Sequence, residues 1–186
     1  MRARVNLEVK AVDPDPEATA QACLELGAAD AGLLRQRDTY FAVRSGRLKL
    51  REDLGEGAAE LIYYERPSVS GVRRSTYRRI PLTAPAEVRE VLSAALGVRG
   101  VVEKTRRLFL FENVRIHLDE VARLGTFVEL EAVLASPAGT ESPGERAALS
   151  RVVEALRIHE RETAAGSYVD LLAQSPSAQE NRPASL

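Results

Sequence analysis

One stretch of the sequence constrains the fold more than any other, the segment R-I-H-L-D-E-V-A-R-L-G-T-F-V-E-L-E at 115–131. Apolar and charged residues alternate at both of its ends, and a short Gly-containing stretch lies between them. A period of two is typical of β-strands, in which successive side chains point to opposite faces. The segment therefore predicts two strands joined by a tight turn, with Glu129 and Glu131 on one face, about 6.5–7 Å apart along the strand.

The register of this hairpin brings acidic residues together. If 121–125 forms the loop, Asp119 lies opposite Phe127. His117 then lies opposite Glu129, and Asp119 is diagonal to Glu129 on the same face. Carboxylates crowded on one sheet face repel each other, so a hard divalent cation or basic side chains must lie among them.

Strand and helix patterns follow one another along the rest of the chain. A two-residue period predicts further strands at 2–12, 32–43, 46–52, 60–66, 72–82 and 101–111. Apolar stripes at helical spacing predict helices at 13–27, 84–97 and 146–162, with a further helical turn at 167–173. In the second helix the stripe includes Val88, Val91 and Leu92, and in the first it includes Cys23, which we interpret as a buried structural thiol. Grouped strands joined by short turns indicate an antiparallel α+β domain.

The charged faces of the strands differ in sign from one strand to the next. Bases concentrate on two faces, Arg47, Lys49 and Arg51 on one and Lys104 with Arg106 on the other, while acids concentrate on the 115–131 hairpin. A flat sheet with a solvated face usually mixes the two signs. A closed barrel of about eight strands would instead place the charges around a narrow lumen and the helices outside. Segregated bases and acids in a lumen suit a polyanion on one side and a metal on the other.

Composition sets the remaining bounds. The chain has 186 residues, with 26 Lys+Arg against 27 Asp+Glu, a balance that argues against a dedicated binder of duplex nucleic acid. We predict one domain at 1–174 and a polar, disordered tail at 175–186. No signal-peptide pattern and no membrane-length apolar run is visible, and one cysteine fits a reducing compartment, so we expect a cytoplasmic protein.

Several motifs in a fixed order resemble those of a known family. They are N-L-E-V-K at 6–10, D-T-Y-F at 38–41, G-R-L-K-L-R-E at 46–52, L-I-Y-Y-E-R-P at 61–67, V-V-E-K-T-R-R at 101–107, and the 115–131 segment. Together they resemble the CYTH superfamily, the triphosphate tunnel metalloenzymes, and within it the branch similar to class IV adenylate cyclase. The resemblance implies an eight-stranded antiparallel β-barrel with two to four helices outside, a triphosphate held in its tunnel, and Mg²⁺ or Mn²⁺ as cofactor.

The resemblance also implies roles for individual residues. The metal-binding acids are Glu8, Asp119, Glu129 and Glu131. The substrate-binding bases are Lys10, Lys49, Arg51, Arg66, Arg74, Lys104 and Arg106. The candidate catalytic residues are Glu8, Lys10, Tyr40 and Arg106. Tyr40 is expected either at a tunnel mouth, in contact with substrate, or as a core aromatic. The family's opening signature is Glu-x-Glu-x-Lys, and Asn6 stands here in place of its first acid, which removes one negative charge.

Three functions are compatible with these patterns. The first is a metal-dependent enzyme that cleaves ATP, inorganic triphosphate or a similar molecule, as a triphosphatase or as an adenylate cyclase. The second is a non-catalytic binder of triphosphate, polyphosphate or a nucleotide, which the loss of an acid at Asn6 motivates. The third is a lipocalin-like carrier, for which a mostly apolar pocket is required. We expect no membrane partner, and pairing with a second copy is left open.

Overall fold

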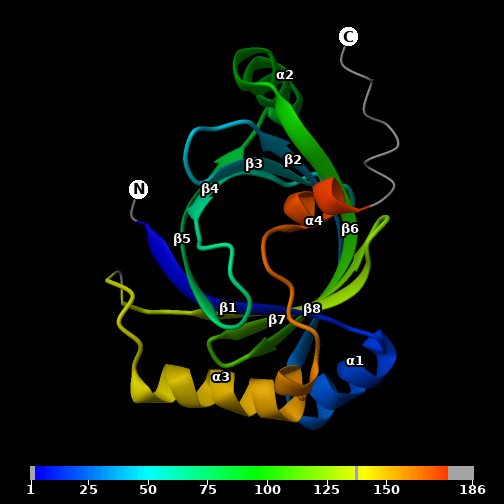
Figure 1. Ribbon diagram of the computed structural model, residues 1–186, viewed down its shortest axis with the longest axis vertical. Helices are drawn as coiled ribbons and strands as arrows, with labels where there is room; N and C mark the ends of the chain where they lie inside the picture. The colour runs from blue at the N-terminus through cyan, green and yellow to red at the C-terminus, as the bar shows by residue number, and fades with distance from the viewer. Residues whose placement is uncertain (1–2, 137, 176–186) are drawn as a thin grey trace.

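The computed structural model describes residues 3–136 and 138–175, and its centre is a closed antiparallel barrel. The eight strands pair around the barrel in the order β1-β5-β4-β3-β2-β6-β7-β8, and β1 pairs with β8 to close it (Figure 1). Their bounds are β1 Arg4–Val12, β2 Ala29–Phe41, β3 Arg47–Asp53, β4 Ala59–Glu65, β5 Arg73–Leu82, β6 Val98–Phe111, β7 Val114–Val121 and β8 Gly125–Val133. The predicted fold class, strand number and antiparallel arrangement are confirmed.

The β7–β8 hairpin has the predicted register. Val121 pairs with Gly125, Asp119 with Phe127, and His117 with Glu129. Gly125 takes a φ of +91°, a left-handed conformation that costs glycine little, and this turn fixes which residues face each other. The side chains of the two strands therefore alternate in phase, with the ionic set on the inner face.

Within the described residues, four α-helices lie outside or across the barrel, namely α1 Pro16–Glu25, α2 Pro85–Leu96, α3 Pro143–Ala155 and α4 Tyr168–Gln174. Helix α1 begins as predicted, because the Asp15 side chain accepts a hydrogen bond from the Ala18 N–H and Pro16 occupies the first turn. The helix predicted at 146–162 begins earlier, at a capping box of Ser142 and Glu145. It also ends earlier, at Ala155, because Arg157 is left-handed and a short 3₁₀ turn follows at Ile158–Glu160.

The main hydrophobic core lies between the barrel wall and two helices, outside the lumen. Figure 1 shows α1 and α3 along the outer side of the wall formed by β1, β7 and β8. The outward side chains of these strands, Val9, Ile116 and Leu130 among them, form one cluster with Cys23 of α1 and Val152 of α3. Burial raises the pKa of the Cys23 thiol to about 12, in keeping with the structural role predicted for it.

Helix α2 forms where it was predicted, but its apolar stripe is only partly covered. Within α2, all of which the structure describes, no residue is buried, and Val91 is 65% exposed. The helix stands at the rim beside β2 and β3, away from the outer wall that α1 and α3 cover (Figure 1). Val88 and Leu92 are half-buried, so the stripe is only partly covered, because periodicity reveals an apolar face without revealing how completely it is covered.

The chain returns at its C-terminal side to close one end of the barrel. Helix α4 lies across that end in Figure 1. Its Tyr168, Val169 and Leu172 join a second apolar cluster with inward residues that include Tyr40 and Phe127. Asp170 anchors the helix, since its carboxylate accepts hydrogen bonds from Arg47 (2.9 Å) and Arg99 (2.6 Å). The barrel is thus a tunnel that α4 closes on one side.

Two further predictions concern the extent of the domain and the C-terminal tail. The single-domain prediction for 1–174 stays a prediction, and the tail predicted at 175–186 lies outside the described residues except for Ser175. Among the described residues, no helix has both the length and the apolar character that crossing a membrane requires.

Candidate functional site: an ionic tunnel inside the barrel

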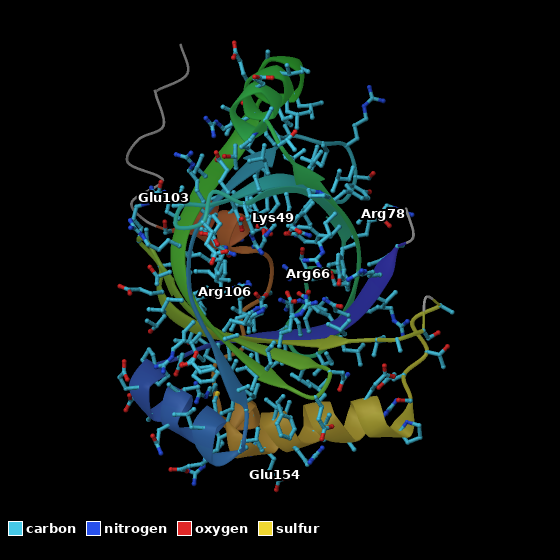
Figure 2. The ribbon with its side chains drawn as sticks, turned by 180° about the vertical axis from the view of Figure 1, so that it is seen from behind. Lys49, Arg66, Arg78, Glu103, Arg106 and Glu154 are labelled. Carbon is cyan, nitrogen blue, oxygen red and sulfur yellow. The ribbon has the colours of Figure 1, made fainter. Side chains whose placement is uncertain are left out.

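The inner side chains of the barrel enclose a cavity of about 340 Å³. In Figure 2 the side chains of Lys49, Arg66 and Arg106 point into the barrel, whereas those of Arg78, Glu103 and Glu154 point away from it. The basic residues that line the cavity are Lys10, Lys49, Arg51, Arg66, Arg79, Lys104, Arg106 and Arg115, and the acidic ones are Glu8, Asp38, Glu60, Glu129 and Glu131. Bases therefore outnumber acids, and the lumen suits a small polyanion.

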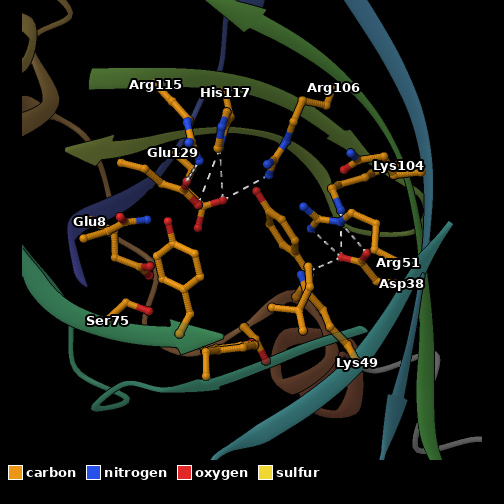
Figure 3. A pocket seen from close by; sticks show the side chains of 18 of the residues that line it. Glu8, Asp38, Lys49, Arg51, Ser75, Lys104, Arg106, Arg115, His117 and Glu129 are labelled. Atoms are coloured by element: carbon orange, nitrogen blue, oxygen red, sulfur yellow. Dashed lines mark hydrogen bonds and ion pairs between the residues drawn. The ribbon is translucent and has the colours of Figure 1, made fainter. Parts of the chain in front are cut away.

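A group of cations surrounds one buried carboxylate, that of Asp38 on β2. Its Oδ2 accepts hydrogen bonds from Lys49 Nζ and Lys104 Nζ, each at 2.9 Å. Arg51 donates to both oxygens, from Nε at 2.7 Å and from the terminal nitrogen at 2.8 Å. Three strands, β2, β3 and β6, thus converge on a group with three cations and one anion (Figure 3).

Burial and mutual repulsion weaken the charges of the two lysines. The pKa of Lys104 falls to about 7, because the ammonium group is desolvated and lies near Arg51. The pKa of Lys49 falls to about 8 for the same two reasons. Burial alone would raise the pKa of Asp38, but Arg51 and the two lysines hold it well below its usual range. A bound anion would favour the charged form of both lysines.

Arg106 forms a second buried ion pair on the neighbouring wall. It donates two hydrogen bonds of 2.6 Å to the carboxylate of Asp119 and a third, of 3.1 Å, to Glu129. The Tyr168 hydroxyl donates to the same carboxylate at 2.8 Å. Although burial opposes the charge, Arg106 lowers the pKa of Asp119 to about 2. Both oxygens of Asp119 therefore accept hydrogen bonds from Arg106 or Tyr168, and the predicted role of this residue as a metal ligand stays a prediction.

Carboxylates and an imidazole form a group on the opposite side of the lumen. Ligand atoms of His117, Glu129 and Glu131 lie within 4.8 Å of one another. Nδ1 of His117 is 3.6 Å from Glu129 Oε2 and 4.0 Å from Glu131 Oε1. Lys10 Nζ is 3.4 Å from Glu129 Oε1. Figure 3 shows Glu129 and His117 facing across the lumen from Lys49 and Lys104.

Glu8 extends this group along β1. It pairs across the strands with Glu131, and it contacts the guanidinium groups of Arg66 and Arg73, the latter at 3.4 Å. Burial and the negative charge of Glu129 raise the pKa of Glu8 despite Arg66. Two residues before it, Asn6 is 3% exposed, and its Oδ1 has no hydrogen-bond partner among the described residues.

A divalent cation fits these donors. Carboxylate and amide oxygens are the ligands that Mg²⁺ and Mn²⁺ take, and imidazole suits several divalent transition metals. Two buried atoms of the group, Asn6 Oδ1 and His117 Nδ1, lack a hydrogen-bond partner within the part of the chain that the structure describes. Native structures rarely leave such atoms unpaired, so each is suited to bind an ion or a water molecule.

Comparison with known proteins agrees with this geometry, since the CYTH domain matches residues 5–168. The chain belongs to the CYTH domain family. Members of this family are triphosphate tunnel enzymes, and the family implies a divalent metal.

Solved structures show the same fold at low sequence identity. The PH1012 protein of Pyrococcus horikoshii is 23% identical, with a TM-score of 0.75 over 89% of this chain and 98% of that one. A conserved hypothetical protein of Pyrococcus furiosus is 17% identical, with a TM-score of 0.71 over 89% of this chain and 99% of that one. A Vibrio parahaemolyticus protein named as a candidate adenylate cyclase is 17% identical, with a TM-score of 0.71 over 90% and 97%. No curated protein matches the chain.

The CYTH tunnel brings together most of the predicted residues. All the predicted bases except Arg74 line it, and so do Glu8, Glu129 and Glu131. Tyr40 also lines the cavity, but at the end that α4 closes, where it is 3% exposed and belongs to the second apolar cluster. Its burial in this cluster fits the alternative of a core aromatic, and a contact with substrate stays a prediction.

Arg74, which was predicted to bind substrate, lies on the outer face of β5 and does not line the cavity. It is exposed and donates to the Gly139 carbonyl at 2.6 Å, whereas its neighbour Arg73 is 3% exposed and reaches Glu8. The segment reads R-R, so alternation alone fits either phase. The inner phase is set by Ser75 and Tyr77, which line the cavity.

The residues of the site that were not predicted include Asp38, Arg73, His117 and Tyr168. Asp38 stands two positions before Tyr40, on the same strand face, so strand phase could have identified it. Tyr168 reaches the lumen only because the segment after α3 crosses the barrel end, and periodicity carries no signal for that path.

Proposed function

We propose that this CYTH protein binds the triphosphate of a small molecule in its tunnel and cleaves it with the help of a divalent metal. The observation that carries this proposal is the opposition of two groups across one cavity of about 340 Å³. Cations held by Asp38 form one side, and carboxylates with an imidazole form the other. That volume is at the small end of ligand pockets, which run from about 300 Å³ upward.

The cations supply the grip on the phosphates. A triphosphate carries about four negative charges, and arginine binds phosphate oxygens through two parallel hydrogen bonds whereas lysine acts as a point charge. Lys49, Arg51 and Lys104 share the single charge of Asp38, so they retain a positive surplus. This surplus holds the chain of phosphates in line for attack.

Glu129 and Glu131, with Glu8 beside them, would hold Mg²⁺ or Mn²⁺. The bound metal supplies neutralisation of the charge that develops on the phosphate oxygens during transfer. Lys10 is buried, and its pKa is lowered chiefly by burial. A lysine of lowered pKa is suited to take a proton from the attacking hydroxyl or water, and Arg106 on the adjacent wall stabilises the departing charge.

The attacking group distinguishes two reactions in the same tunnel. Water attack on the terminal phosphorus of ATP or inorganic triphosphate makes the protein a triphosphatase. Attack by the ribose 3′-hydroxyl on the α-phosphorus of ATP yields cyclic AMP and pyrophosphate, the reaction for which the Vibrio parahaemolyticus protein is named a candidate. Incubation with ATP and with inorganic triphosphate, each with Mg²⁺ and Mn²⁺, separates the two by their products.

The paired change Glu129→Gln and Glu131→Gln tests the metal assignment. We expect turnover to fall below detection while inorganic triphosphate still binds, because the amides keep the shape but remove the charge that holds the cation. The matched control is Glu120→Gln, an exposed residue of the same hairpin that faces outward. Unchanged turnover in the double variant would contradict the assignment.

Non-catalytic binding is the second candidate, and Asn6 favours it. Its buried, unpartnered Oδ1 stands where the family signature has an acid, so the site carries one negative charge fewer than the signature provides. Tight binding of inorganic triphosphate without product, together with turnover gained by Asn6→Glu, would support this candidate. The lipocalin-like carrier has no support, because charged residues line the cavity. A cytoplasmic location and pairing with a second copy stay untested expectations.

A further inference from the structure

His117 occupies an unusual position for a histidine. Its residue is 4% exposed in the middle of β7, and the side chain faces the lumen between Glu129 and Glu131 of β8. Its Nδ1 is buried and has no hydrogen-bond partner among the described residues. A buried polar nitrogen of this kind costs free energy unless something binds it.

The distances around Nδ1 suit a shared ion better than a direct hydrogen bond. A hydrogen bond would bring the nitrogen and oxygen to about 2.9 Å. The observed separations are longer, 3.6 Å to Glu129 Oε2 and 4.0 Å to Glu131 Oε1. Two ligands that each bind one ion at about 2.1 Å lie about 3.0 Å apart at right angles and about 4.2 Å apart when opposed. Both separations fall between these limits.

The surrounding cations still allow one oxygen of each glutamate to face an ion. Arg115 is 3.7 Å from Oε2 of Glu131, so Oε1 is the oxygen that faces His117. Lys10 lies beside Oε1 of Glu129 at 3.4 Å, so Oε2 is the oxygen that faces His117. Arg106 donates to this Oε2 at 3.1 Å, and a carboxylate oxygen has a second lone pair for an ion.

We propose that His117 is a direct ligand of the divalent cation, together with Glu129 and Glu131, and that the site consequently prefers Mn²⁺ to Mg²⁺. Imidazole suits divalent transition metals, whereas Mg²⁺ favours a shell made of oxygen alone. Binding of the cation by His117 does not depend on the proposed function. Only the use of the bound cation in catalysis rests on it. The competing arrangement is a protonated imidazole that forms ion pairs with both carboxylates and binds no metal.

Pulsed electron paramagnetic resonance of the Mn²⁺-loaded, tag-free protein tests the bond directly. The chain has two histidines, so a directly coordinated imidazole ¹⁴N signal has few sources. We expect this signal in the wild type, its loss in His117→Gln, and its retention in His159→Gln, which alters an imidazole that is 62% exposed in the 3₁₀ turn after α3. Stoichiometric Mn²⁺ binding without ¹⁴N coupling, or coupling that persists in His117→Gln, would overturn the proposal.

A second measurement covers the case in which His117→Gln does not fold. Wild-type protein labelled with ¹⁵N-histidine should then lose the ¹⁴N coupling, and an unchanged signal would overturn the proposal. If the variant folds, its Mn²⁺ affinity should fall by at least the ~10–100-fold that loss of an outer-shell partner costs. Its preference for Mn²⁺ over Mg²⁺ should also fall in a competition between the two ions. An unchanged preference would count against His117 as a ligand.

The two proposals fail in different ways. Triphosphate turnover with Mg²⁺, together with Mn²⁺ binding that lacks ¹⁴N coupling, would refute the imidazole ligand and leave the proposed function standing. Clear ¹⁴N coupling without turnover of any triphosphate would confirm the ligand and refute the enzyme.

Discussion

Every lysine of the chain lies inside the tunnel. The sequence has three lysines, Lys10, Lys49 and Lys104, and each is at most 9% exposed. The cationic residues elsewhere in the chain are arginines. Burial can neutralise a lysine but not an arginine at ordinary pH, because only the lysine pKa falls within reach. The tunnel thus carries cations whose charge responds to an anion.

Triphosphate binding should take up protons near neutral pH. The free tunnel holds Lys104 at a pKa of about 7 and Lys49 at about 8, and a bound anion raises both values. Affinity is therefore greatest below about pH 7, where both lysines are already charged, and falls as pH rises through 7–8. Calorimetric titration with inorganic triphosphate, in two buffers of different ionisation enthalpy between about pH 6 and 9, measures both the affinity and the proton uptake.

Lys104→Arg is the control for this prediction. Arginine keeps its proton throughout the range, so the variant should take up fewer protons and show a shallower loss of affinity with pH. The titration of triphosphate itself is common to both proteins and cancels in the comparison. Identical pH profiles for wild type and variant would show that Lys104 does not titrate on binding.

Among the elements, the β7–β8 hairpin was the most predictable and α4 the least. Two strands with a clear two-residue period and one Gly turn determine their own register, so the pairing of His117 with Glu129 followed from the sequence. The neighbours of Asp38 come from β3 and β6, and no local pattern connects them. The sequence did not show whether Arg73 or Arg74 of β5 faces the lumen, because two consecutive arginines fit either phase of the alternation.

Loss of the Asp170 carboxylate should release α4 from the barrel end. Asp170→Ala removes both arginine contacts and half of a capping box, since Asp170 also accepts from Ser167. A hydrogen bond to a charged group contributes at most roughly 1.5–3 kcal/mol to stability, and partial exposure of the group reduces this value. We therefore expect the free energy of local opening of α4 to fall by roughly 1–3 kcal/mol. Hydrogen exchange of the α4 amides measures this opening.

Asp15→Ala is the matched control, because Asp15 caps α1 on the outer wall. It should speed amide exchange in α1 and leave α4 unchanged, whereas Asp170→Ala should do the reverse. Unaltered protection of α4 in Asp170→Ala would mean that the apolar contacts of Tyr168, Val169 and Leu172 hold the helix without the ion pairs.

The whole molecule has its core outside the barrel and its charges inside. Helices α1 and α3 cover the apolar outer face of β1, β7 and β8, which leaves the inner face to ionic residues. The net charge of −1 conceals this separation, but the sorting of bases and acids among strands reveals it and predicted the barrel. The position of α4 over the barrel end and the partial exposure of the apolar face of α2 depend on contacts between distant segments, and these were not predictable from local patterns.

A triphosphate in the tunnel would lie near all three lysines, and the sequence has no other lysine to add a background signal. Its binding is measured by titrating inorganic triphosphate into protein labelled with ¹³C at the lysine ε-carbons and following these carbons by NMR. We expect the ε resonances of Lys49 and Lys104 to shift together as the ligand binds, with Lys10 following. Binding that leaves all three resonances unmoved would contradict this expectation, because a ligand that avoids every lysine of the chain is not in the tunnel.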